Sequence, residues 1–406
     1  MNALQYGRRT FLVIVLLSLL SCSGGESGTG YQQGQTTVGE VTGFGSIYVN
    51  GIHFNTDSAA VEIDGNASDE LNLSVGMIVK VVGTVNASRT EGVANQIYMS
   101  TAIEGLVFAN NYGTDNTINV MGQIVNISND THFNSSVPGI ITVNDLVEND
   151  TIVEVHGFTG GNGEFFATMI NVVGTGGTAT EVKIRGIIQS STGTTAGSTF
   201  LLGGITVQFD NSTVLEDGLQ MTDLVNGVFV AVESSNYSIG MGQVLATKIE
   251  PVNEHEAEGT SYELEGIVTD ITNIGSSEFS LNGQRVLFDL NTQFEGGTSA
   301  DIQLATELEV KGVVQSDSSI LASEIAFHAE SDMGVEGLVT SIGTNTLTID
   351  GATTVMVNEL TSYIDDVDEL NHTFHFNQIT VGMQIKAKYY VDSMMVNIAT
   401  SIERTN

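Results

Sequence analysis

The chain has 406 residues and a formal net charge of −36, from 48 acidic and 12 basic side chains. Hydrophobic residues make up 41% of the chain, which excludes a wholly disordered protein, and the acidic excess disfavours binding to nucleic acid or to anionic membrane surfaces. The 46 glycines and 2 prolines are typical of short strands joined by tight turns, and the single cysteine excludes an intramolecular disulfide.

Residues 1–22 have the pattern of an export signal. Arg8-Arg9 precedes the apolar run Phe11–Leu20, which is too short to span a membrane as a mature helix. The run ends in Leu19-Leu20-Ser21-Cys22, which resembles a bacterial lipobox. This resemblance implies that Cys22 is lipidated and becomes the mature N-terminus. Ser23 after the cysteine implies sorting to the outer membrane, on its periplasmic or its exposed side.

The start of the leader leaves the export route open. Arg8–Leu12 also resembles the twin-arginine pattern, so both this route and the general secretory route are compatible with the sequence. Residues 23–37, SGGESGTGYQQGQTT, are rich in Gly, Ser, Gln and Thr. We expect them to form a flexible tether between the lipid and the first domain.

The stretch Gly39–Phe54, GEVTGFGSIYVNGIHF, predicts a β-hairpin. Asn50-Gly51 lies between two alternating apolar runs, and this dipeptide favours a type I′ turn because both central residues need positive φ. A later strand alternates in the same way, as in Val79-Lys80-Val81. The unit therefore has the pattern of a small antiparallel sheet with one apolar face.

Four weaker copies of this unit follow, with their opening glycines about 65 to 80 residues apart, a spacing that suits small β domains rather than a one-turn solenoid. We expect closure into a barrel, because an open sheet of this size would leave two exposed edges. The predicted fold is thus all-β, a tandem array of five small antiparallel OB-like barrels, with a small sandwich as the alternative. Each is expected to lean on its neighbours. The predicted repeats are 38–100, 101–174, 179–252, 260–330 and 332–406.

The opening of the first copy resembles a known family. Gly39–Ser46, GEVTGFGS, and the turn Val49-Asn50-Gly51 are similar to the bacterial domain of unknown function 5666, which occurs singly and in tandem in predicted lipoproteins. The resemblance is sharp in the first copy, fair in the fourth and fifth, and loose in the second and third, which lack the Gly-Phe-Gly loop. It implies an exported β-rich module, and it implies no activity.

Catalytic signatures are absent from the sequence: there is no Gly-x-Ser-x-Gly elbow, P-loop, His-Glu-x-x-His or Cys-x-x-Cys. The seven histidines are scattered along the chain, and His372 and His375 are the one close pair. Near Glu369 this pair is a conceivable metal site, but a solvated loop is the preferred interpretation. We therefore predict no enzyme activity and no cofactor.

Clustered acids are the better candidates for metal ligands. Asp365, Asp366, Asp368 and Glu369 lie together in the last copy, and calcium favours six to eight oxygens from such loops. In the first copy Asp64 and Asp69 flank a Gly-Asn turn. Neither cluster has the spacing of a known calcium loop, and a solvated acidic surface is the alternative for both.

These observations favour a lipid-anchored cell-envelope protein with a non-enzymatic binding or scaffold role. Its expected partners are the membrane, through the lipid on Cys22, and an envelope protein or polysaccharide, with no nucleic acid. The alternative is a calcium-dependent carbohydrate-binding or adhesion module, and an envelope enzyme is the third class.

Overall fold

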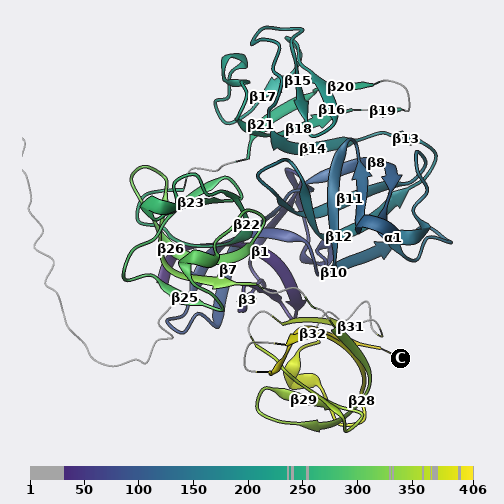
Figure 1. Ribbon diagram of the computed structural model, residues 1–406, viewed down its shortest axis with the longest axis vertical. Coiled ribbons are helices and arrows are strands. Elements are labelled where there is room, and N and C mark those ends of the chain that lie inside the picture. Colours follow the sequence, from purple (N-terminus) through teal and green to yellow (C-terminus); the bar gives the residue numbers. More distant parts are fainter. Residues whose placement is uncertain are drawn as a thin grey trace, which may run out of the picture. The chain divides into compact units, whose positions relative to one another are not determined.

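The computed structural model describes residues 32–235, 237–238, 242–252, 256–328, 331, 333–358, 361–365, 367, 374–391 and 395–405 (Figure 1). The prediction of an all-β chain is confirmed, since these residues form 33 strands, a single four-residue α-helix, α1 (Tyr112–Asp115), and short 3-10 turns. No helix in this described part is long and apolar enough to cross a membrane. The predicted leader, with Cys22, lies outside the described residues.

The first repeat is a closed five-stranded barrel with the strand order of an OB-fold. Strand β1 pairs with β2, β2 with β3, β3 with β7, β7 with β6, and β6 returns to β1; only the β3–β7 pairing is parallel. A further strand, β4, runs parallel to the end of β7. The elements are β1 (Gln32–Phe44), β2 (Ile47–Val49), β3 (Ile52–Asn55), β4 (Ala60–Ile63), β5 (Asn66–Ser68), η1 (Glu70–Asn72), β6 (Ile78–Val85) and β7 (Glu91–Met99).

Strand β1 begins earlier than the tether prediction allows. Residues 32–37 were expected in the flexible tether, but this segment pairs with β6, and residues 35–37 also pair with a strand of the fourth repeat on the other side. Gln35, Thr36 and Thr37 are accordingly buried. Their polarity fits a tether in sequence, whereas in the structure strand pairing on both sides satisfies their backbone.

Repeats 2, 4 and 5 close in the same order. Figure 1 shows the last repeat, in yellow-green and yellow, as a ring of strands. Repeat 2 has β8 (Ile103–Asn110), β9 (Thr117–Val120), β10 (Gln123–Ser135), η2 (Val143–Asp145), β11 (Ile152–Thr159) and β12 (Phe165–Gly174). Repeat 4 has β22 (Ser261–Asp270), η4 (Ile274–Ser276), β23 (Glu278–Leu281), β24 (Gln284–Leu287), β25 (Gln293–Glu295), η5 (Ser299–Asp301), β26 (Glu307–Val314) and β27 (Ile320–Phe327). Repeat 5 has β28 (Met333–Ile342), β29 (Thr346–Ile349), β30 (Thr353–Met356), β31 (Ser362–Asp365), η6 (Phe376–Gln378), β32 (Gln384–Val391) and β33 (Asn397–Arg404).

Repeat 3 follows the same path with its last strand divided. Strand β20 pairs with β16, and β21 pairs with β18, where the other repeats have one continuous strand. A single bridge, Gln189 to Leu201, joins the two parts of the sheet near its start. The elements are β13 (Thr178–Ala179), β14 (Val182–Ile187), β15 (Thr199–Leu202), β16 (Ile205–Gln208), β17 (Val214–Leu215), η3 (Met221–Asp223), β18 (Phe229–Ser234), β19 (Tyr237–Ser238), β20 (Gln243–Leu245) and β21 (Lys248–Pro251).

The predicted Asn-Gly turn and the opening glycine act together. Asn50 and Gly51 have φ values of 49° and 70°, as a type I′ turn requires. The Asn50 side chain folds back over the first strand and donates to the carbonyl of Val38, and a Cβ on Gly39 would overlap it. The opening glycine is therefore a packing requirement of the turn. The same pairing recurs as Gly266 with Asn282 and Gly337 with Asp350.

The period-2 pattern places one face of each sheet in an apolar core. In repeat 1, Val41, Val79, Val81 and Ile97 are almost completely buried within one cluster. Repeats 4 and 5 each have a core of their own, while the cores of repeats 2 and 3 form one continuous cluster. Apolar burial of this kind is the main source of stability in such small domains.

Backbone pairing also joins different repeats. Strand β1 lies parallel to β22, in register from Gln35 opposite Ser261 to Val38 opposite Leu264, so repeats 1 and 4 share one sheet. Repeats 2 and 3 are joined by the strand pair Lys183 opposite Glu104, and by a 2.7 Å hydrogen bond from the backbone N–H of Gly204 to the carbonyl of Gly122. The sequence led us to expect contacts between neighbouring repeats. It does not predict that repeat 1 pairs directly with repeat 4.

Candidate metal centre

A cavity of about 500 Å³ lies among residues of repeats 1, 2, 4 and 5. Repeat 4 supplies three ionisable side chains to it, Glu265, Glu307 and His328. Repeats 1 and 2 contribute Glu40 and His132. Carboxylates and imidazoles from three different barrels therefore line one cavity.

Three neighbouring strands position the repeat 4 side chains. Glu265 is on β22, Glu307 begins β26, and His328 follows β27. In these strands the residues on either side, Leu264 and Leu308 among them, point into the barrel core, so the glutamates face outward. Such positions are normally solvated, but here the neighbouring repeats cover them.

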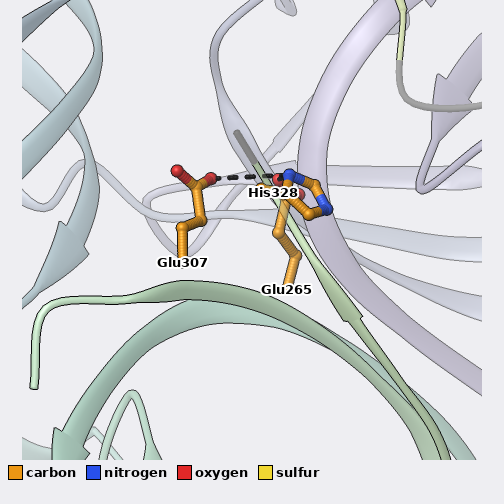
Figure 2. Close-up of side chains that lie close together, drawn as sticks. All are labelled: Glu265, Glu307 and His328. Carbon is orange, nitrogen blue, oxygen red and sulfur yellow. Dashed lines mark ion pairs between the residues drawn. The ribbon is translucent and has the colours of Figure 1, made fainter. Parts of the chain in front are cut away.

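The three side chains converge on one point. Nδ1 of His328 is 3.5 Å from Oε1 of Glu265 and 3.8 Å from Oε1 of Glu307. One ligand atom from each residue lies within 4.8 Å of the other two. Figure 2 shows the two carboxylates approaching the same edge of the imidazole. On the far side of the ring, Nε2 is 3.9 Å from Glu309, beyond hydrogen-bond length, and has no hydrogen-bond partner.

Glu40 and Asn50 of repeat 1 also line the cavity beside the three repeat 4 side chains. Oε2 of Glu265 accepts a 2.7 Å hydrogen bond from the backbone N–H of Glu40, whose carboxylate is 3.5 Å from Nε2 of His132. The side chain of Asn50 is 5% exposed and lines the cavity; its Nδ2 donates to Val38, while its Oδ1 has no partner. The site thus contains one buried oxygen acceptor without a donor, beside a group of carboxylates.

Burial makes the charged carboxylates unfavourable in this site. Burial, reinforced by the neighbouring charges of Glu307 and Asp130, raises the pKa of Glu40 to about 8. Burial likewise raises the pKa values of Glu265 and Glu307 to about 7. Burial alone would lower the pKa of His328, but the surrounding carboxylates outweigh it and raise this pKa to about 10. Either protons or a cation must balance the carboxylates near neutral pH.

The donor set indicates which cations fit. Calcium takes six to eight oxygen ligands, whereas zinc and related transition metals accept imidazole nitrogen together with carboxylate oxygen. One imidazole and two carboxylates in mutual reach are therefore a set for a divalent transition-metal cation. Asn50 offers a further oxygen close by.

The acidic cluster predicted from the sequence lies elsewhere. Asp365 ends β31, where Nη1 of Arg404 is 2.9 Å from its carboxylate. Asp366, Asp368 and Glu369 lie outside the described residues, so this calcium site stays a prediction. Lipidation of Cys22 stays a prediction for the same reason.

The other candidates from the sequence have separate structural partners. His375 stacks on Tyr48 with a centroid distance of 4.1 Å, and His372 lies outside the described residues. Asp64 is 2.9 Å from Nζ of Lys183, and Asp69 accepts from the backbone of Leu71 at the start of η1. The structure thus brings Asp64 and Asp69 to different partners.

Sequence reasoning did not single out the centre in repeat 4. Glu307-Leu308-Glu309-Val310 alternates as an exposed strand does, and His328 appears as one of seven scattered histidines. The usable signal was the concentration of outward glutamates on adjacent strands of one repeat, with a histidine at the end of the next strand. Its burial depends on other repeats and cannot be read from that pattern.

The chain was compared with curated proteins, solved structures and family models. No curated protein matches the chain. A solved structure described as "drosophila Unr CSD456" is 14% identical, covers 55% of this chain and 96% of its own, and has a TM-score of 0.13. The family model of the domain of unknown function DUF5666 matches residues 37–97, 104–171, 185–250, 265–326 and 336–403. The chain therefore belongs to the DUF5666 family and carries five tandem copies of its domain.

Proposed function

We propose that this protein is a non-enzymatic binding protein of the cell envelope, anchored through a lipid on Cys22, which binds a divalent transition-metal cation among its repeats. The observation that carries this proposal is the convergence of Glu265, Glu307 and His328 in a cavity covered by other repeats. The leader pattern and the acidic composition support the envelope placement.

Charge balance supports a cation as the ligand. The carboxylates of Glu265, Glu307 and Glu40 share this cavity, and His328 is the imidazole within reach of two of them. In the absence of a cation, protons must neutralise these groups. A divalent cation replaces those protons and takes the imidazole nitrogen as a ligand.

The position of the cavity supports a scaffold role. A cation bound by repeat 4 would lie against Glu40 and Asn50 of repeat 1, so binding would tie repeats that are far apart in sequence. Ligands that bind only the folded state stabilise it by mass action. The proposed role of the cation is to hold a rigid arrangement of domains rather than to activate a substrate.

Calorimetric titration of the chelator-treated full chain with Zn²⁺, Mn²⁺ and Ca²⁺ tests the proposal. We expect one transition-metal cation per chain, proton release on binding, and a rise in melting temperature. Replacing His328 by Asn or Glu307 by Gln should weaken binding about tenfold or more, because each removes one ligand.

His53→Asn is the matched control. His53 also lies beside a carboxylate, with Nδ1 3.0 Å from Glu91, but it does not line the cavity. This variant should bind like the wild type. Absence of stoichiometric binding, or equal binding by the His328→Asn variant, would contradict the metal centre, and selective binding of Ca²⁺ would contradict the assigned ligand class.

A further inference from the structure

A second cavity, of about 380 Å³, lies among residues of repeats 1 to 4. Lys80, Lys183, Arg185 and Lys248 line it, in a chain that has only 12 basic residues in all. Six acidic side chains line it as well: Glu62, Asp64, Glu216, Asp217, Glu233 and Glu250. The partners of the basic side chains determine which of them is available to a ligand.

The three lysines are neutralised by carboxylates of the chain. Each has a carboxylate oxygen within ion-pair distance of its Nζ: Lys80 with Glu256 at 2.7 Å, Lys183 with Asp64 at 2.9 Å, and Lys248 with Glu233 at 2.7 Å. Glu250 is also 3.1 Å from Nζ of Lys248. These side chains form part of the packing between repeats.

Arg185, on β14, differs from the lysines. Within the part of the chain that the structure describes, its guanidinium forms no ion pair, and its buried Nε has no hydrogen-bond partner. Glu250 and Asp64, the acids whose charges act on it, are engaged by lysines. With 48 acidic residues in the chain, an arginine left unpaired in a cavity is unexpected. A desolvated, unpaired charge is costly, so this arrangement calls for a partner.

Two more polar side chains without partners line the same cavity. His156 is 1% exposed, and neither of its ring nitrogens has a hydrogen-bond partner. Thr159, on the same strand β11, is 4% exposed, and its Oγ1 also has none. Burial lowers the pKa of His156 to about 4, so near neutral pH the ring offers one donor and one acceptor.

We propose that this cavity binds a small oxyanion, a carboxylate or a phosphate, whose oxygens accept hydrogen bonds from the guanidinium of Arg185. The planar guanidinium fork matches two oxygens of either group. Thr159 and His156 supply the remaining polar contacts, and the rings of Tyr98 and Tyr262 provide apolar wall. This site is separate from the proposed metal centre and does not depend on it.

Calorimetric titration and thermal melts of the full chain test this site with succinate and inorganic phosphate. Succinamide serves as the neutral analogue of succinate, and sodium chloride at equal ionic strength controls for screening. We expect at least one of the two anions to bind and raise the melting temperature, and succinamide to have no effect. Binding of succinate would identify a carboxylate as the ligand group, and binding of inorganic phosphate would identify a phosphate.

Three variants locate the binding. Arg185→Gln should weaken anion binding about tenfold or more, because charge-assisted hydrogen bonds are lost. Arg185→Lys should retain part of the affinity, since the charge remains without the fork. Arg285→Gln is the matched control, because Arg285 is 44% exposed and paired with Glu278 and Asp317; it should bind like the wild type.

Thr159→Val keeps the test informative if the Arg185 variants fold poorly. It replaces the hydroxyl by a methyl group of similar size and should also weaken binding. Binding of neither anion at millimolar concentration would overturn the proposal and assign the polar groups of the cavity to water. Equal binding by the wild type and by both Arg185→Gln and Thr159→Val would also overturn it, by placing the anion elsewhere.

Discussion

Repeats 3 and 4 have the same strand order but are built and attached differently. In repeat 4 the last barrel strand is continuous and the Asn282 turn folds over Gly266, whereas in repeat 3 the last strand is divided and the turn is Gly203-Gly204. Repeat 4 shares a ladder with β1, while repeat 3 is joined to repeat 2 through the pair Lys183 and Glu104. The barrel therefore tolerates different turn chemistry.

The largest expected effect is on the free energy of unfolding, and it should differ between the opening glycines of repeats 4 and 3. Gly266→Ala should lower the free energy of unfolding by about 3 kcal/mol, because the new methyl group overlaps the side chain of Asn282. In repeat 3, Gly186 is the equivalent opening glycine, and a Cβ there would lie 3.6 Å from its nearest neighbour.

Gly186→Ala is accordingly the matched control, and it should change the free energy of unfolding by less than about 1 kcal/mol. Urea denaturation of both variants, compared with the wild type, measures the difference. Equal destabilisation by both substitutions would show that the turn side chain is not the reason for the glycine.

A smaller effect concerns how repeat 3 is attached. Burial raises the pKa of Glu104 from 4.5 to about 7, although Lys183 acts in the opposite direction. The folded chain therefore holds this proton at pH values where the unfolded chain has released it, and the stabilisation is lost as the pH rises from 4.5 through 7. The joint between repeats 2 and 3 should loosen over this range.

Hydrogen exchange of β14 at pH 5 and at pH 8, corrected for the intrinsic exchange rate, measures this loosening. Glu104→Gln should flatten the pH dependence, because the side chain stays neutral. Glu181→Gln is the control, since Glu181 is 3.2 Å from Nζ of the same Lys183 but is 56% exposed. The interpretation fails if the Glu104 variant keeps the full pH dependence.

The smallest effect on the stability of repeats 3 and 4 is expected from removing the predicted lipid anchor. Cys22→Ser should abolish incorporation of labelled fatty acid and release the chain from the membrane fraction, while the free energy of unfolding of the folded repeats stays unchanged. Ser27→Ala, in the predicted tether, should remain lipidated. Fatty-acid labelling that persists in the Cys22→Ser variant would exclude the lipobox interpretation.

Much of the fold could be predicted from the sequence because its determinants are local. The Asn50-Gly51 turn, the alternation of Val79 and Val81 and the opening Gly39 each concern residues that interact within one repeat. The five-fold recurrence of the pattern then extended that prediction over most of the chain, and the family match agrees with it.

The candidate metal centre could not be predicted, because its defining property is burial by distant residues. Glu265 and Glu307 occupy outward strand positions that are solvated in an isolated barrel. They become part of a cavity because Glu40 and its strand, more than two hundred residues earlier, lie against them. Periodicity identifies the face on which a side chain lies, but it does not identify what covers that face.

The pairing of β1 with β22 also limits how this array can change in evolution. A tandem array of independent domains can gain or lose a copy at any place, because no domain contacts a distant one. Here the chain leaves repeat 1 and must return to it after two intervening barrels, so that β22 reaches the open edge of β1. Deleting a middle copy would shorten that return path and expose a strand edge that invites aggregation. The pairing of β1 with β22 thus depends on the number of repeats between them.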